Sequence, residues 1–147
     1  MNALHRFLRQ PAGRRLLLIE ATVYLLLARL ALRVLPFRRI AAWLNRPSQR
    51  AELTGEERER IRKEVVWAIE RTARHLPGET VCFPRGLAAQ TMLRRRSIST
   101  TLYYGAATLP ERGLTAHVWV QDGDEGVVGH REAGSYHILA RYPEPHG

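Results

Sequence analysis

The sequence predicts an α+β domain in which helices precede a small antiparallel sheet. Apolar residues from Ile61 to Leu76 recur every three or four positions, which places them on one face of a helix. Ala116–Gln121 alternates in the manner of a strand, and Asp122–Gly126 has the composition of a hairpin turn. Helices followed by antiparallel strands are the arrangement of an α+β domain.

Length and composition limit the class of protein. A chain of 147 residues suits one compact domain with a helical extension. A single cysteine excludes an internal disulfide and is typical of a reducing compartment. Residues 1–13 are mixed and basic and do not form a secretory signal. We therefore expect a cytoplasmic protein.

Residues 16–37 are the most apolar region of the chain. Glu20, Arg29 and Arg33 interrupt it, and a membrane span needs about twenty predominantly apolar residues. We therefore predict no transmembrane span but a buried or partner-facing helix that ends before Pro36. A helix lying on a membrane surface is the alternative, because arginines flank the apolar face.

A second short helix is expected over Phe37–Leu44, and Asn45–Ser48 has the composition of a linker. We divide the chain there into an N-terminal helical extension, residues 1–47, and a main domain, residues 53–147. The excess hydrophobicity of the extension makes it a candidate docking surface for a partner.

The main domain is predicted to begin with an amphipathic helix. Thr54 and Glu57 have the spacing of a capping box, and Pro77-Gly78 ends the helix. The later segments are expected to form strands and their connections. These are a strand over Ser99–Ala106, a loop over Thr108–Gly113, the Ala116–Gln121 strand, a returning strand from Val127, and a strand over Ser135–Arg141.

Cys82 stands where another helix should begin. Pro84 suits a first helical turn, and Leu87, Ala88 and Met92 continue at helical spacing. A helix N-terminus favours the thiolate, which is the nucleophilic form of cysteine. A lone cysteine is also commonly a small buried apolar residue, so Cys82 by itself leaves both roles open.

His117 strengthens the catalytic interpretation. It lies on the predicted Ala116–Gln121 strand, well downstream of Cys82. A cysteine at a helix start with a histidine on a later strand is the outline of a cysteine nucleophile and its base.

Three stretches then form a pattern. They are Cys82-Phe83-Pro84-Arg85-Gly86-Leu87-Ala88, Leu93-Arg94-Arg95-Arg96 leading into Thr100-Thr101-Leu102-Tyr103-Tyr104-Gly105, and Leu114-Thr115-Ala116-His117-Val118-Trp119-Val120. The pattern resembles the lasso-peptide leader peptidases, which are cysteine proteases with a transglutaminase-like, papain-like fold. The resemblance runs from about Leu53 to the end of the chain.

The resemblance implies an endopeptidase that removes the leader from a ribosomally made lasso-peptide precursor, with Cys82 and His117 as its catalytic pair. It also implies two partner proteins, a separate small leader-binding recognition element and an ATP-dependent cyclase. We expect this chain to be the protease part of such a split system.

The third catalytic group is open, because the family has an aspartate on the returning strand where this chain has Val127-Val128-Gly129-His130. His130, Asp122 and Asp124 are the candidates, and Glu132 is also near in sequence. For the two aspartates, which lie in the predicted hairpin turn, plain turn residues are the favoured interpretation.

Two further residues are candidates for substrate binding. Arg85 lies one turn beyond Cys82, where it would bind substrate or form a structural ion pair. Trp119 shares a strand face with His117, where it would shield the site, line a substrate groove or pack in the core.

The net charge of +9 favours an anionic partner, such as an acidic leader peptide. No zinc-finger spacing, RNA-binding motif or recognition helix indicates nucleic acid. We expect no metal and no cofactor, because the chain has no His-Glu-x-x-His pattern, no zinc-binding set and no phosphate loop. Two alternatives stay open: a transglutaminase-type acyl transferase using the same pair, and a non-catalytic basic module that binds nucleic acid or membrane.

Overall fold

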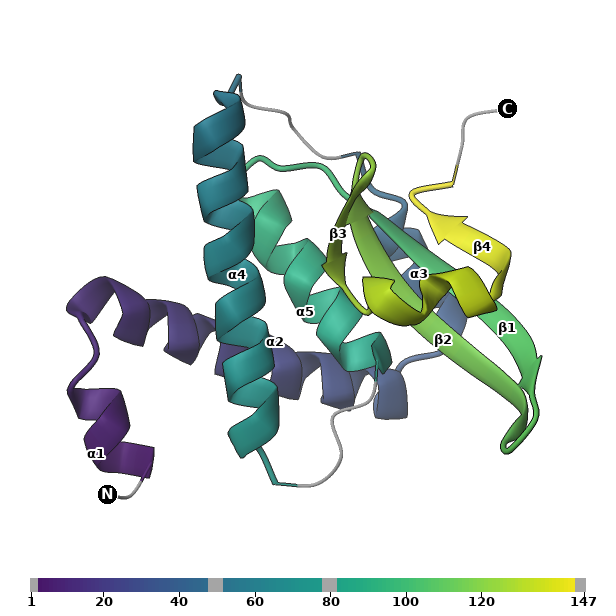
Figure 1. The fold of residues 1–147 in the computed structure, drawn as a ribbon, viewed down its shortest axis with the longest axis horizontal. Coiled ribbons are helices and arrows are strands. Elements are labelled where there is room, and N and C mark those ends of the chain that lie inside the picture. The colour runs from purple at the N-terminus through teal and green to yellow at the C-terminus, as the bar shows by residue number, and fades with distance from the viewer. Residues whose placement is uncertain (1–2, 48–51, 78–81, 145–147) are drawn as a thin grey trace.

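The computed structural model describes residues 3–47, 52–77 and 82–144. In this part of the chain, helices come first and a four-stranded antiparallel sheet follows (Figure 1). The helices are α1 (Ala3–Leu8), α2 (Ala12–Val34), α3 (Phe37–Leu44), α4 (Gly55–His75) and α5 (Cys82–Arg95). The strands are β1 (Thr101–Leu109), β2 (Gly113–Asp122), β3 (Glu125–Val128) and β4 (His137–Tyr142), with the short 3-10 helix η1 (His130–Ser135) before β4. The predicted α+β class is confirmed.

The helices begin and end close to the predicted positions. α2 ends at Val34, and Leu35 is extended ahead of Pro36, as the proline requires. The predicted capping box opens α4, where the Thr54 hydroxyl accepts from the Glu57 N–H at 3.1 Å and the Glu57 carboxylate accepts from the Thr54 N–H at 3.3 Å. Ser48 of the predicted linker and Gly78 of the predicted helix stop lie outside the described residues.

The sheet has the order β3-β2-β1-β4. β1 pairs with β2 as far as Leu109 opposite Gly113, so the predicted Thr108–Gly113 loop is too long. Continued pairing satisfies backbone groups that a loop would leave to water, and a short turn connects the two strands. The last strand begins at His137 and not at Ser135, because η1 includes Ser135.

One hydrophobic core joins the elements, and α5 lies at its centre. α5 packs against α2 and α4 and also against the strands of the sheet. Leu25 of α2 and Leu44 of α3 are fully buried, as are Ile69 of α4 and Met92 of α5. The predicted helical extension therefore shares its core with the rest of the domain.

The contact between α5 and the sheet is close at Gly86. A Cβ at this position would lie 2.9 Å from Val118 Cγ1 and 3.3 Å from Leu102 Cδ1. Gly86 therefore sets how near the helix that carries Cys82 lies to the strand that carries His117.

The arginines at the end of α5 connect it to the extension. Arg94 donates to the last carbonyls of α3. Arg95 and Arg96 bind the carboxylate of Glu20 on α2, at 3.1 and 2.7 Å. The hydrogen bond from Arg96, opposed by burial and assisted by Arg95, holds the pKa of Glu20 below its usual range.

Candidate active site

Cys82 is the first residue of α5, as predicted, and its side chain is half-buried. Pro84 lies in the first turn, where its missing N–H leaves no helical bond unmade. Backbone N–H groups at a helix start have no intrahelical acceptor, so they are available to an anion beside the thiol.

His117 lies on β2 opposite Gly105 of β1 and is 7% exposed. Its Nε2 is 2.8 Å from the carbonyl oxygen of Gly129, which follows β3. Because a carbonyl oxygen accepts hydrogen bonds and cannot donate them, Nε2 must carry the hydrogen. Neutral His117 therefore keeps its lone pair on Nδ1, the nitrogen that is left to act as a base.

Cys82 and His117 line one small cavity of about 260 Å³. The start of α5 and the end of β3 lie at the same end of the domain (Figure 1), which brings residues from both to one cavity. Val118 and Val128 supply apolar wall, and Arg85, Gly129 and Glu132 complete the lining. The cavity thus brings together a thiol, an imidazole, a guanidinium and a carboxylate.

Aromatic rings hold the His117 imidazole in place. The ring of Trp119 is stacked on it at 5.9 Å between centroids, and that of Tyr136 lies at 5.0 Å. Trp119 is 2% exposed and is itself stacked on Tyr103. Trp119 therefore lies behind His117 in the packing and not in the lining of the cavity.

Arg85 does line the cavity, and it also forms an ion pair. Its Nη1 lies 3.0 Å from the Glu70 carboxylate of α4, while its Nε is buried with no hydrogen-bond partner among the described residues. Arg85 can therefore form its structural ion pair and still bind substrate, since one guanidinium has several donors.

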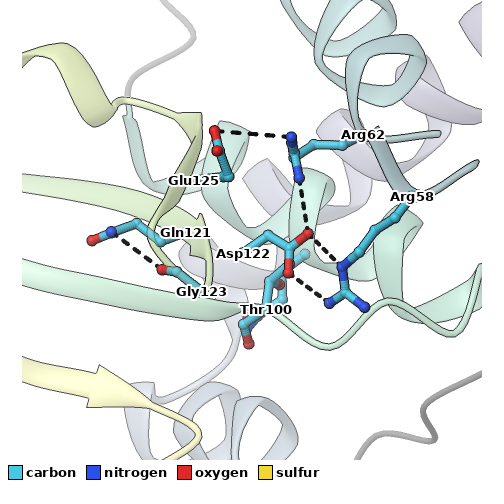
Figure 2. A network of polar contacts seen from close by, with 8 residues as sticks. Arg58, Arg62, Thr100, Gln121, Asp122, Gly123 and Glu125 are labelled. Carbon is cyan, nitrogen blue, oxygen red and sulfur yellow. Dashed lines mark hydrogen bonds and ion pairs between the residues drawn. The ribbon is translucent and has the colours of Figure 1, made fainter. Parts of the chain in front are cut away.

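Asp122 is placed away from His117. It lies five residues further along β2, about 16 Å at the rise of a strand. Figure 2 shows its carboxylate between two arginines of α4, with Arg58 Nη2 at 2.6 Å and Arg62 Nη1 at 3.1 Å. Burial raises the pKa of the Asp122 carboxyl, but the two guanidinium groups outweigh burial and hold that pKa below its usual range. Asp122 thus ties α4 to the sheet.

We expect Asp122→Asn to destabilise the fold by about 2 kcal/mol, because it leaves two arginines facing a neutral amide.

The pKa values of Asp122 and Glu20 are both lowered by folding. Their stabilisation is therefore complete above the ordinary carboxyl pKa of about 4 and is lost as the pH falls through the lowered values. Urea unfolding at several pH values measures the loss of stability in Asp122→Asn and the loss of stability of the wild type at low pH. Glu59→Gln, which removes an exposed pair with Lys63, is the control and should leave stability unchanged.

The other predicted third residues also lie elsewhere. Asp124 is exposed in the β2–β3 turn, at the far end of β3 from Gly129. The ring of His130 occupies the space that a side chain at Gly126 would need, and it is not part of the cavity lining.

The partner that the structure gives to His117 is a backbone carbonyl, that of Gly129. Sequence reasoning missed it because every residue has a carbonyl and its aim depends on the fold. One signal was present: a glycine directly after the returning strand permits the left-handed conformation seen there, with φ of 70°.

Glu132 is a weaker second partner. Its carboxylate lies 3.7 Å from His117 Nε2, and its side chain is 71% exposed. Solvent screens such a pair, so we expect Glu132→Gln to reduce kcat/KM by no more than about fivefold. A pH profile of both proteins on one substrate measures this effect, and a loss of several hundredfold would contradict it.

The described residues contain no group of three or more His, Cys, Asp or Glu side chains that could hold a metal ion. In the same part of the chain, no helix is both long enough and apolar enough to span a membrane.

Comparison with known proteins identifies the family of the chain. No curated protein and no solved structure is significantly similar to the chain. Residues 22–141, from within α2 to within β4, match the family described as the transglutaminase-like superfamily. Because the match covers most of the chain and includes Cys82 and His117, the protein belongs to the transglutaminase-like superfamily.

Proposed function

We propose that this protein is a cysteine endopeptidase that removes the leader peptide from a ribosomally made lasso-peptide precursor. The observation that carries the proposal is the shared cavity of Cys82 and His117, with His117 held by the Gly129 carbonyl so that Nδ1 is its free base. The resemblance of the three sequence motifs to leader peptidases supports the choice of substrate.

The first half of the proposed reaction forms an acyl-enzyme. His117 Nδ1 takes the proton from the Cys82 thiol, and the sulfur attacks the carbonyl carbon of the scissile bond. Backbone N–H groups at the start of α5 donate to the oxyanion that forms. The carbon–nitrogen bond then breaks, the leaving amine of the core peptide takes the proton from His117, and the leader remains as a thioester on Cys82.

The second half of the proposed reaction regenerates the free enzyme. His117 removes a proton from water as the water oxygen attacks the thioester carbonyl. The carbon–sulfur bond breaks, and the proton on His117 returns to the sulfur. The leader leaves with a new carboxyl group, which loses its remaining proton to solvent and becomes a carboxylate. The reaction consumes one water and needs no cofactor.

The proposal includes partners. A separate recognition-element protein binds the leader and presents it, and a cyclase receives the released core peptide. The excess of arginine in this chain, with a net charge of +9, suits an acidic leader or partner surface.

The test mixes the full chain with a recognition-element protein and the precursor peptide in heavy-oxygen water and follows the products by mass spectrometry. Hydrolysis predicts a leader with heavy oxygen in its new carboxylate and an unlabelled core peptide. An acyl transferase, the second candidate in this superfamily, would instead join the leader to an added amine without taking up the label. Precursor left intact under all conditions would reject both functions.

A further inference from the structure

The outer side of α2 carries a row of exposed apolar side chains, which we call the outer stripe. Its members recur at intervals of three and four residues and are between 47% and 68% exposed. They are Leu16, Ile19, Val23, Leu26, Leu30 and Val34. With about 3.6 residues per turn, this spacing places all six on one side of the helix.

The outer stripe is additional to the side of α2 that packs in the core. Leu17, Leu18, Ala21, Leu25 and Ala28 are buried against α4 and α5. α2 therefore has a second apolar side that the domain leaves largely exposed, and it runs for about 27 Å at 1.5 Å per residue. Apolar patches of this extent on a protein surface mark a binding site.

The charged residues of the helical segment that carries the outer stripe are almost all positive. Glu20 is the single acidic residue between Ala3 and Pro47, and it is already paired with Arg95 and Arg96. The same segment contains nine arginines. They are Arg6, Arg9, Arg14, Arg15, Arg29, Arg33, Arg38, Arg39 and Arg46.

The exposed apolar stripe and the excess of arginine together indicate which kind of partner covers this surface. A second copy of the chain would bring arginine-rich flanks together, which is unfavourable. A partner helix in a coiled coil is matched by flanking charges of both signs, and α2 has only one acid, which is paired inside the protein. Apolar residues with flanking arginines and no free acid are the composition of a helix that lies in the headgroup region of an anionic bilayer.

We propose that α2 docks this protein on an anionic membrane surface, with the outer stripe among the lipid headgroups and exposed arginines of the same segment, such as Arg33, Arg38 and Arg39, on their phosphates. The helix lies parallel to the bilayer and does not cross it. α5 lies between α2 and the sheet, so the cavity of Cys82 and His117 remains open on the other side of α5. This inference is independent of the proposed peptidase function.

The experiment is a flotation assay of the full chain with two kinds of vesicle, phosphatidylcholine alone and phosphatidylcholine with phosphatidylglycerol in equal parts. We expect the protein to float with the anionic vesicles and not with the neutral ones. Binding should weaken as salt is raised, because salt screens the arginine–phosphate attraction.

Two matched variants test the surface. Leu26→Gln with Leu30→Gln removes apolar side chains from the outer stripe, and we expect at least about tenfold weaker binding. Leu114→Gln with Leu139→Gln removes two still more exposed leucines from the sheet, at 81% and 63% exposure, and should bind like wild type. All four residues are exposed, so circular dichroism should show a native fold in both variants.

Several results would overturn the proposal. These are failure of the wild type to float with anionic vesicles, equal binding to both kinds of vesicle, or equal losses in the two variants. A wild-type dimer that the Leu26→Gln/Leu30→Gln change converts to monomer, without vesicle binding, would assign the stripe to a second copy. Loss of recognition-element binding in that variant, again without vesicle binding, would assign it to the protein partner expected from the sequence.

Discussion

Replacing Cys82 with alanine is expected to reduce the proposed leader release by at least about 10³-fold in kcat/KM, because among the described residues that line the cavity Cys82 alone has a thiol or hydroxyl group. Cys82 is half-buried at the end of a helix, so the smaller side chain should leave the fold intact. Single-turnover cleavage of the precursor, followed by mass spectrometry, measures the loss. A circular dichroism melt of the variant provides the check on folding.

His117→Ala is expected to cause a comparable loss, and combining it with Cys82→Ala should add little. Groups that act together in one step show this non-additive behaviour. Multiplicative losses in the double variant would show that the two residues do not act in the same step. Cleavage that persists in Cys82→Ala would remove this residue from the mechanism and leave the peptidase proposal without its nucleophile.

Gly129→Ala is expected to have the largest effect of any change outside the Cys82–His117 pair, with kcat falling by about 10²-fold. A Cβ at this position would lie 2.6 Å from the carbonyl oxygen of Val118 and 3.2 Å from His117 Nε2. The backbone must therefore move, and the Gly129 carbonyl that fixes the proton on Nε2 moves with it. Kinetics across pH together with thermal unfolding separate the loss of catalysis from the loss of stability.

Gly123→Ala is the matched control for this variant. Gly123 has φ of 61°, close to the 70° of Gly129, but no atom lies within 4 Å of the added methyl. Both substitutions therefore impose a left-handed alanine, at a cost of about 1 kcal/mol, and only Gly129→Ala disturbs the site. Equal activities of the two variants would show that the Gly129 carbonyl has no part in positioning His117.

Local patterns in the sequence predicted most of the elements. Thr54 and Glu57 identified the start of α4, Pro36 marked the end of α2, and Cys82 was placed at the first residue of α5. These features depend on residues close together in the chain, such as caps, prolines and the repeat of apolar side chains. Strand ends were less accurate, because pairing across the sheet decides how far a strand continues.

The sequence by itself also determined the two chemical groups of the site, because a cysteine at a helix start and a histidine on a later strand are visible as residue types. It did not determine what holds the histidine. Asp122 had the right chemistry, but the rise of β2 carries it about 16 Å past His117, to Arg58 and Arg62.

Only the tertiary structure decided that the Gly129 carbonyl accepts from His117, since a carbonyl is common to all residues and its direction comes from the turn between β3 and η1. Tertiary structure also decided which side of α2 is exposed. Its apolar composition was visible in the sequence, but packing against α4 and α5 decided which leucines are buried and which form the outer stripe. Burial depends on contacts between distant segments, and no local pattern records them.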